Sequence, residues 1–313
     1  MTEGQDIQDH AIFRQPWWLD AVAPGRWNEV VVKKGEELAA RLPYVVGKRA
    51  GLTFLEMPPL TQFLGPWLRP SEAKTARRLA SEKDLMTELI QGLPRFDHFR
   101  QNFHHSITNW LPFYWKGFTQ TARYTYRLED LSDFDKLWSE FAENVRRAVR
   151  KAEKGLAVRA DLGIEDFIRL NELTFSRQGT KMPYSSDLVR RLDSACAERG
   201  VRKMFFAEDA EGCVHAALYI IWDSEAAYNL MLGSDPDVRG SGASTLVMWE
   251  AIKFASTVTK AFDFEGSMIE SIERSFRSYG ASQVSYSQVS RMSRRMRFLQ
   301  SCRGMLGALS SGD

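Results

Sequence analysis

The chain contains little of what several classes of protein require. Its 313 residues include three cysteines, Cys196, Cys213 and Cys302, and an odd number without paired spacing excludes a disulfide framework. Free thiols are typical of a reducing compartment, so we expect a cytoplasmic protein. No apolar run approaches the roughly 20 residues that span a bilayer, and the polar opening MTEGQDIQDH lacks the apolar core of a secretory signal.

An excess of charge of one sign is also absent. Lysine and arginine number 42, aspartate and glutamate number 40, and the net charge is +2. A chain so close to neutrality is not a bulk polyelectrolyte binder, and we expect no stable DNA binding, although a local basic groove is compatible with this balance.

Patterns for metal binding and for nucleophilic catalysis are missing as well. His98, His104 and His105 are close in sequence, but no cysteine or carboxylate follows them at ligand spacing. We therefore expect no metal cofactor. No Ser-His-Asp or Cys-His arrangement is recognisable, which is consistent with a reaction that needs no protein nucleophile.

The residues that are present indicate a folded protein of two parts. Hydrophobic residues make up 44% and charged residues 26% of the chain, which supplies a core and excludes wholesale disorder. The first predicted domain, residues 1–130, is rich in tryptophan, proline and phenylalanine, and Pro16 suits the first turn of a helix. Its other predicted elements are strands at 27–32, 39–46, 52–55, 95–103 and 123–128 and a polar helix at 71–91.

The second predicted domain, residues 131–290, alternates helices and strands. A capping box at Ser132–Asp135 starts a helix whose apolar stripe continues to Ala152. The elements that follow are helices at 164–177, 186–199, 243–257 and 269–279, and strands at 201–208, 213–222, 226–233, 261–264 and 283–289. This order predicts an α/β fold with a mixed sheet.

The last predicted element, residues 291–313, is a basic amphipathic helix. It contains Arg291, Arg294, Arg295, Arg297 and Arg303 with no acidic residue between them, and Met292, Met296 and Leu299 give it an apolar face. Such a helix can dock on its own protein, on an anionic membrane surface or on RNA.

Four segments of the second domain resemble a known superfamily. The loop Asp237–Ala243 is similar to the Arg/Gln-x-x-Gly-x-Gly/Ala loop of GNAT acyltransferases. The basic helix end Asn144–Gly155, the stretch Phe262–Ser267 and the stretch Ser275–Gly280 resemble, in this order, the "RKAEK-G", "DF-x-GS" and "FK-x-FG" elements of Fem-type peptidyltransferases. The resemblance covers about residues 132–289.

This resemblance implies two GNAT-like units, each a mixed sheet flanked by helices, with a degenerate first unit. It implies an N-acyltransferase that moves an acyl or aminoacyl group from acyl-CoA or aminoacyl-tRNA to an amine. The acceptor would be a cell-wall precursor, a glycan or an amino-acid-derived metabolite. Attack would be direct, because aminolysis of an activated ester needs no protein nucleophile.

The glycine-containing loop is the expected donor site. Arg239, Gly240, Ser241, Gly242, Ala243 and Ser244 join a strand to the N-terminus of a helix. Glycines let the backbone approach a ligand, and the amides and positive dipole end of a helix attract phosphate. The alternative is a tight turn that starts a helix and binds nothing.

The expected catalytic groups lie on and after the neighbouring strands. The resemblance implies that strand 226–233 separates from its neighbour and that its backbone polarises a carbonyl, with Tyr228 and Asn229 as the polar candidates. Glu265 could take a proton from the amine or hold its ammonium. Strand packing for Tyr228 and Asn229, and a helix-dipole role for Glu265, are the alternatives.

Two further positions concern the donor and the acceptor. Arg277 stands where the family has a lysine that contacts the donor; it keeps the charge but cannot act as a titrating acid. Arg177, Lys181 and Tyr184 could line the entrance for the acceptor, or belong to a plain surface loop. The competing functions are a catalytically silent GNAT scaffold that binds or senses a ligand, and a peripheral membrane or RNA-binding module.

Overall fold

A computed structural model describes residues 9–177, 179, 181–238, 240–266 and 268–309. Contacts divide the chain into two compact units. The first contains residues 23–123 and 285–309 together with Asp9, and the second contains His10–Val22 and Tyr124–Val284. Residues 10–22 thus belong to the second unit, whereas residues 285–309, which follow the second unit in the sequence, belong to the first.

The first unit contains a sheet of hydrogen-bonded strands together with helices. Its elements are β1 (Trp27–Lys34), β2 (Glu37–Arg49), β3 (Leu52–Glu56), β4 (Trp67–Leu68), α2 (Thr75–Gly92), β5 (His98–Asn102), α3 (Leu111–Trp115), the end of β12 (Ser282–Met292) and α10 (Arg294–Leu309). The strand order is β1-β2-β3-β5-β12, with β4 paired to β2. The β3–β5 pair is parallel and the others are antiparallel.

The core of the first unit lies between this sheet and α2. The buried side chains of α2 are Leu85, Met86, Leu89 and Ile90, which recur at the spacing of one helix face. Gly92, the last residue of α2, allows close packing, because a Cβ atom there would lie 2.3 Å from Cγ1 of Val30. The predicted polar helix is therefore amphipathic, with its apolar face at the C-terminal end.

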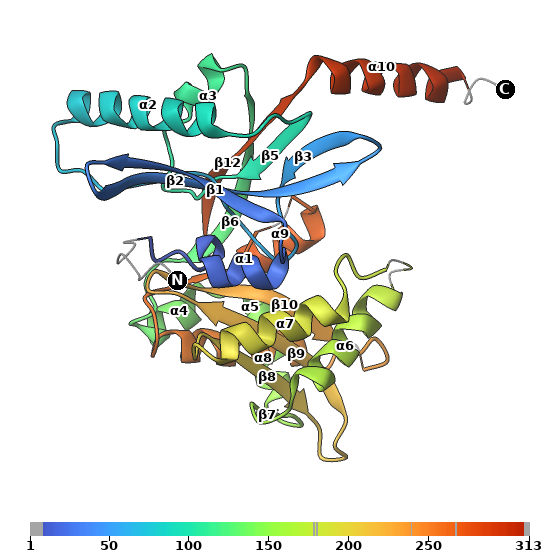
Figure 1. Cartoon of the computed structure of the whole chain (residues 1–313). Coiled ribbons are helices and arrows are strands. Elements are labelled where there is room, and N and C mark those ends of the chain that lie inside the picture. Colours follow the sequence, from blue (N-terminus) through green and yellow to red (C-terminus); the bar gives the residue numbers. More distant parts are fainter. Residues whose placement is uncertain (1–8, 178, 180, 239, 267, 310–313) are drawn as a thin grey trace. The chain divides into compact units, whose positions relative to one another are not determined.

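The second unit is a mixed sheet between two groups of helices. Its elements are η1 (Ile12–Arg14), α1 (Pro16–Val22), β6 (Thr119–Leu128), α4 (Phe134–Glu140), α5 (Glu143–Ala152), β7 (Ala157–Arg159), α6 (Ile164–Arg177), α7 (Ser186–Ala197), β8 (Arg202–Glu208), β9 (Val214–Trp222), β10 (Ala226–Ser234), α8 (Ala243–Ala255), β11 (Ala261–Asp263) and α9 (Glu270–Arg277). The strand order is β6-β11-β10-β9-β8-β7. In Figure 1 the blue α1 lies against the yellow α7, although they are far apart in sequence.

The predicted α/β class with a mixed sheet is confirmed, and most elements of the second unit lie within a few residues of their predicted ranges. The single helix predicted from Phe134 to Ala152 is wrong. It is interrupted at Phe141 and Ala142, which have extended backbones. Phe141 turns into the core, and the Ala142 amide donates to the Ser278 carbonyl (2.8 Å). These tertiary contacts outweigh the helical periodicity.

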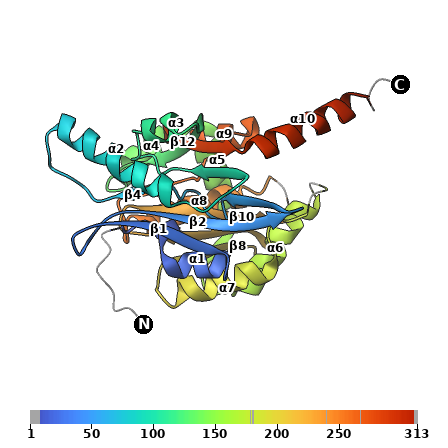
Figure 2. The same cartoon turned by 45° about the horizontal axis from the view of Figure 1, so that its top comes forward.

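The C-terminal helix begins later than predicted. Arg291 and Met292 belong to β12, where they pair with Phe99 and His98 of β5, and α10 begins at Arg294. Within the described ranges, no helix combines the length and the apolar character that crossing a bilayer requires. Figure 2 shows α10 extending away from the strands of the first unit.

Candidate active site

Strands β10 and β11 separate after a short parallel pairing. Only Ala226, Ala227 and Tyr228 pair with β11, which ends at Asp263. β10 continues along β9 to Ser234, with an irregularity between Asn229 and Met231. An inserted residue bends a strand and increases its twist, and bulges are common beside active sites. The predicted separation of strand 226–233 from its neighbour is therefore present, and it begins at Asn229.

Glu265 lies directly after the end of β11. Its backbone has a φ of 60° and is followed by Gly266 at 55°. Non-glycine residues adopt this left-handed conformation at a cost, and such residues cluster at functional sites. At Gly266 no side chain fits, because a Cβ atom would lie 2.1 Å from the Tyr124 carbonyl oxygen. The tight turn therefore fixes where the Glu265 side chain leaves the sheet.

The Glu265 carboxyl group has an unusual electrostatic environment. Part of the residue is accessible, but Oε1 is shielded from solvent and has no hydrogen-bond partner. Burial raises its pKa well above the usual 4.5, and the negative charge of Asp263 adds to this effect. A carboxyl group with a raised pKa and an unused acceptor atom is suited to take up a proton from a bound group.

Asp263 has a different environment, although it is only two residues away. Its Oδ1 accepts from the Thr125 hydroxyl (2.5 Å) and the Glu265 amide (2.8 Å), and its Oδ2 accepts from Arg127 (3.1 Å). These partners occupy the carboxylate. Asp263 therefore stabilises the turn, and of the two acids Glu265 is the one with an unused oxygen.

Tyr184 reaches the same region from the segment between α6 and α7. Its hydroxyl donates to Asn171 Oδ1 (3.0 Å), and Asn171 Nδ2 donates to the Leu232 carbonyl of β10 (3.4 Å). Burial raises the pKa of Tyr184 to about 12, and the charge of Glu265 contributes to the rise. The structure thus brings together two of the predicted residues, Tyr184 and Glu265, beside the separated part of β10.

α6 packs unusually close to the free part of β10. A Cβ atom at Gly233 would lie 2.8 Å from the Asn171 amide nitrogen. The Thr174 hydroxyl accepts from the Ser234 amide (2.8 Å), so on the edge of β10 away from β9 a side chain of α6, rather than a strand, bonds the end of β10. The backbone groups of β10 nearer to Asn229 are the ones that remain candidates for contact with a carbonyl group.

The polar residues of β10 occupy different surroundings. Asn229 is buried and its Oδ1 has no hydrogen-bond partner. Tyr228 is buried against Phe13, with ring centroids 4.9 Å apart, and its hydroxyl donates to Asp223 (3.2 Å). Asn229 therefore offers an unused acceptor at the point of separation, whereas the hydroxyl of Tyr228 is engaged in a structural contact.

The predicted donor loop precedes α8 and borders a cavity of about 340 Å³. Its lining includes Gly240, Ser241, Gly242, Ala243 and Ser244, and also His215. Gly242 (φ 86°) caps α8, and a Cβ atom there would lie 2.4 Å from the Ala148 carbonyl oxygen. The loop is open where a ligand would lie and closely packed where it meets α5. Arg239 lies outside the described residues.

The cavity at this loop has Asp235 in its lining, and a cation lies beside the loop. Lys151 of α5 donates through Nζ to the Gly240 carbonyl (2.6 Å), and the N-terminus of α8 contributes its positive dipole end. The residues present therefore fit a phosphate-containing donor on two observations, an open cavity at a helix N-terminus and a neighbouring ammonium group.

Comparison with known proteins agrees with this geometry. Residues 139–266 match the family model for the acetyltransferase (GNAT) domain. The matched residues include β10, the loop, α8 and β11, which form the part that contains the cavity and the separated strands. No curated protein sequence matches the chain.

Solved structures similar to the whole chain include that of FemX, with a TM-score of 0.63 at 12% identity over 89% of this chain and 93% of that one. A tandem GNAT protein from the clavulanic acid biosynthesis pathway gives 0.51 at 11% identity over 85% and 82% of the two chains. L-PGS from Bacillus licheniformis gives 0.53 at 9% identity over 85% of both. At such low identity these likenesses establish a tandem GNAT fold and no activity.

Three predicted residues are exposed or only partly described. Arg277 lies on α9 with its side chain 64% exposed, and its Nε pairs with Glu273 (3.1 Å). Lys181 is exposed. The Arg177 backbone ends α6, and its side chain lies outside the described structure.

Sequence reasoning missed several residues around the GNAT domain. Asn171 is buried within the apolar stripe of α6. The sequence contained one signal for it, a polar residue at a position of this apolar stripe. Asp209, Cys213 and His215 offer ligand atoms within 4.8 Å of one another, a group that could hold a metal ion. The expectation of no metal considered other histidines and overlooked this trio, which lies on a hairpin.

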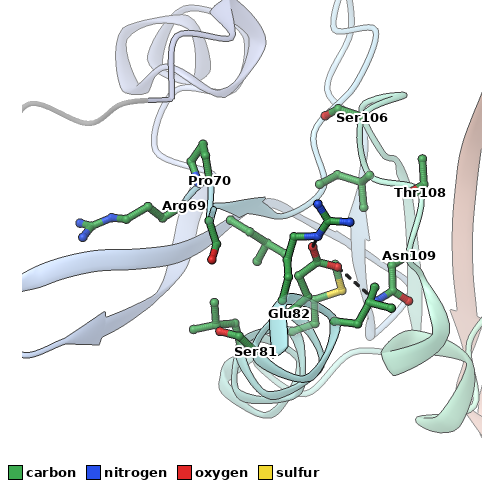
Figure 3. Close-up of a pocket in the computed structure, with 14 residues that line it drawn as sticks. Arg69, Pro70, Ser81, Glu82, Ser106, Thr108 and Asn109 are labelled. Atoms are coloured by element: carbon green, nitrogen blue, oxygen red, sulfur yellow. Dashed lines mark hydrogen bonds and ion pairs between the residues drawn. The ribbon is translucent and has the colours of Figure 1, made fainter. Parts of the chain in front are cut away.

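The first unit has a cavity of its own, of about 440 Å³. Figure 3 shows its wall, where Glu82 of α2 accepts from Asn109 (3.3 Å) and pairs with Arg78 (3.7 Å). The lining carries hydroxyl groups of Ser81, Ser106 and Thr108 but no glycine-rich loop. This cavity is therefore unlike the one at α8.

Proposed function

We propose that the protein is an N-acyltransferase whose second unit transfers an acyl group to an amine. The observation that carries the proposal is the Glu265 carboxyl group, with a shielded, unpartnered oxygen and a raised pKa, placed just beyond the point where β10 and β11 separate. The cavity at the start of α8 supports a donor with phosphate groups on the same unit.

The donor we propose is acyl-CoA. The match of residues 139–266 to an acetyltransferase domain favours this donor. Its phosphates would bind at Gly240–Ser244 beside Lys151, with the Arg239 side chain nearby in sequence. Aminoacyl-tRNA shares the same chemistry, a phosphate-bearing carrier with an activated acyl carbon, and is the alternative donor. Binding of the tRNA donor would be favoured by the cations at the end of α5 that are exposed, Arg147, Lys151 and Lys154.

The reaction proceeds by direct aminolysis. The amine lone pair attacks the carbonyl carbon, the C–S bond of the thioester breaks, and the thiol leaves with a proton. Glu265 in its ionised form accepts the proton that the attacking nitrogen loses and releases it to the leaving thiolate, so that one proton moves from nitrogen to sulfur overall. The backbone of β10 near Asn229 polarises the carbonyl group, because fixed dipoles there act on the charge that develops on its oxygen.

The acceptor is a primary amine that enters beside Tyr184. The Tyr184 hydroxyl is held by Asn171, and Arg177 and Lys181 follow on the segment that leads to it, where they would attract an acceptor with carboxylate or phosphate groups. Arg277, exposed on α9, would contact an anionic part of the donor. A cell-wall precursor, a glycan or an amino-acid-derived metabolite has this chemistry.

A catalytically silent binding protein is the second candidate. It is favoured by Thr174, which bonds to the Ser234 amide of β10, and by arginine at position 277 in place of the family's lysine. In this case the cavity at α8 would bind a ligand without turnover.

The test begins with the purified full chain. Mass spectrometry of ligands retained under native conditions, followed by calorimetric titration with CoA and acetyl-CoA, measures donor binding. We expect CoA binding to be at least about tenfold weaker in Ser241→Asp and unchanged in Ser241→Ala. CoA binding without turnover of any amine would support the catalytically silent protein. Absence of both CoA binding and charged-tRNA consumption would contradict the proposed enzyme.

A further inference from the structure

The first unit presents exposed aromatic side chains on α3. In this helix Tyr114 and Trp115 are 58% and 59% exposed and Leu111 is 48% exposed, while Phe113 is fully buried. Phe113 packs against Phe99, Phe103 and Phe118. The buried ring anchors the helix, so the exposed side chains are held outward on a rigid support.

The start of α10 presents a similar combination of groups. Phe298 is 69% exposed and Leu299 is 41% exposed. Phe298 lies one turn after Arg294 and Arg295, on the same face of the helix. Met296 is half-buried, so the face with Phe298 is the one directed away from the protein.

The two helices belong to one continuous surface of the first unit. Arg291, three residues before α10, donates to the carbonyl of Lys116, the residue that follows α3 (3.0 Å). The guanidinium group of Arg291 also lies over the rings of Phe96 and Phe118. In both views α3 and α10 lie on the same side of this unit (Figures 1 and 2). We call Leu111, Tyr114, Trp115, Lys116, Arg294, Arg295, Arg297, Phe298 and Leu299 the basic-aromatic surface.

The charged residues of this surface have one sign, and Asp97, which interacts with Arg295, lies beside it. Between Asp97 and Glu129 the sequence contains no acidic residue, and from Arg291 onward it contains none before Asp313. Arg294, Arg295 and Arg297 are all exposed. The charge is local, because the chain as a whole carries a net charge of +2.

We propose that the basic-aromatic surface docks on an anionic lipid bilayer. Tryptophan and tyrosine favour the level of the headgroups, and phenylalanine and leucine insert into the acyl boundary. Arginine side chains extend their charge to lipid phosphates while their stems contact apolar groups. Exposed Leu111 and Leu299 favour a bilayer over RNA, since aliphatic side chains gain nothing from contact with a nucleic acid backbone. The surface lies in the unit without the glycine loop, so this inference does not depend on the proposed function.

The experiment is cosedimentation of the full chain with vesicles of phosphatidylcholine that contain phosphatidylglycerol, compared with phosphatidylcholine alone. We expect binding to the anionic vesicles, weakened by added salt, and little binding to the neutral ones. The triple variant Arg294→Gln, Arg295→Gln, Arg297→Gln should bind the anionic vesicles roughly a hundredfold more weakly. The double variant Tyr114→Ser, Trp115→Ser should bind them about tenfold more weakly even at low salt.

The matched control removes the same charge from the second unit. The variant Arg169→Gln, Arg190→Gln, Arg274→Gln changes side chains that are 62%, 45% and 69% exposed, and it should bind within about twofold of the wild type. Equal loss in this control, or equal binding to neutral vesicles, would overturn the proposal. Absence of vesicle binding together with tight RNA binding that the α10 triple variant abolishes would assign the surface to RNA instead.

Discussion

The two units contain the same crossover with opposite outcomes. In each, three antiparallel strands lead to a helix and then to a strand parallel to the third: β3, α2 and β5 in the first unit, and β10, α8 and β11 in the second. In both, the parallel strands pair over two or three residues and then separate.

The difference lies in what fills the place beyond the pairing. In the first unit the connection after β3 returns to β5: the Leu64 amide donates to the Asn102 carbonyl (2.9 Å), and Leu64 forms a bridge with Phe103. Since β12 takes the other edge of β5, this segment fills the gap that β3 leaves. In the described part of the second unit, no backbone segment bonds in the corresponding place, and Glu265 follows instead.

The same topology therefore leaves the space between the separated parallel strands filled in one unit and open in the other. The difference depends on the segment that connects the third strand to the helix. The first connection is long and contains Pro58, Pro59, Pro66 and Pro70, which hold it in an extended path. The second is short and glycine-rich, and it leads directly into α8. We therefore expect substitutions in the second crossover to change turnover or donor binding. Substitutions in the first crossover should change only the stability of the protein.

The largest expected effect is on turnover. Glu265→Gln should lower kcat by roughly 10²- to 10⁴-fold, since a positioned general base contributes that much, with little change in donor affinity. Glu82→Gln, in the wall of the first unit's cavity, should leave kcat within about twofold. Steady-state kinetics with a primary amine measures both, and a large effect of Glu82→Gln would remove the distinction between the units.

The second prediction concerns the filled crossover. Gly65 has a φ of 75°, and a Cβ atom there would lie 2.6 Å from the Phe103 ring. Gly65→Ala should lower the free energy of unfolding by about 2–4 kcal/mol, because overpacking adds to backbone strain, and donor affinity should not change.

Gly240→Ala provides the matched control for this prediction. Its φ is similar (80°), but nothing lies within 4 Å of the added atom. Chemical denaturation should show a loss of about 1 kcal/mol from strain alone. Equal losses for the two variants would mean that the packing at Phe103 contributes nothing.

A smaller effect is expected on donor binding. Ser241→Asp places a negative charge at the start of α8 and should weaken CoA binding at least about tenfold, by repulsion of phosphate. Ser71→Asp, which adds the same charge beside the cavity of the first unit, should leave CoA binding unchanged. Calorimetric titration distinguishes the two sites.

The smallest effect is on stability as pH changes. The folded chain raises the pKa of Glu265 above 4.5, so above that pH the native state binds more protons than the unfolded state. Stability then falls as pH rises, by up to about 1.4 kcal/mol per pH unit, until the folded pKa is passed. Glu265→Gln removes this cost, so its unfolding free energy should exceed that of the wild type at neutral pH and converge with it in acid. A constant difference across pH would contradict the burial of the charge.

The fold was largely accessible from sequence, because strand alternation and helical stripes in the second unit are strong local patterns. The break at Phe141 was not, since it depends on Ser278, which is distant in sequence. For the site, Glu265 and Tyr184 came from position relative to the motifs, and the structure places them in one region. Asn171 and the filled crossover depend on packing between segments, which a single sequence does not contain. The roles assigned to Arg277, Asn229 and the loop residues stay predictions.

The division of the chain also has a consequence for biosynthesis. β5 requires β12, whose part in the first unit follows residues 124–284 of the second unit, so the first sheet lacks an edge partner until those residues have been translated. Residues 10–22 are made before the rest of the second unit and must wait for it. A nascent chain therefore exposes an incomplete sheet on the ribosome, and a cut at residue 130 yields two fragments that each lack a piece of their own core.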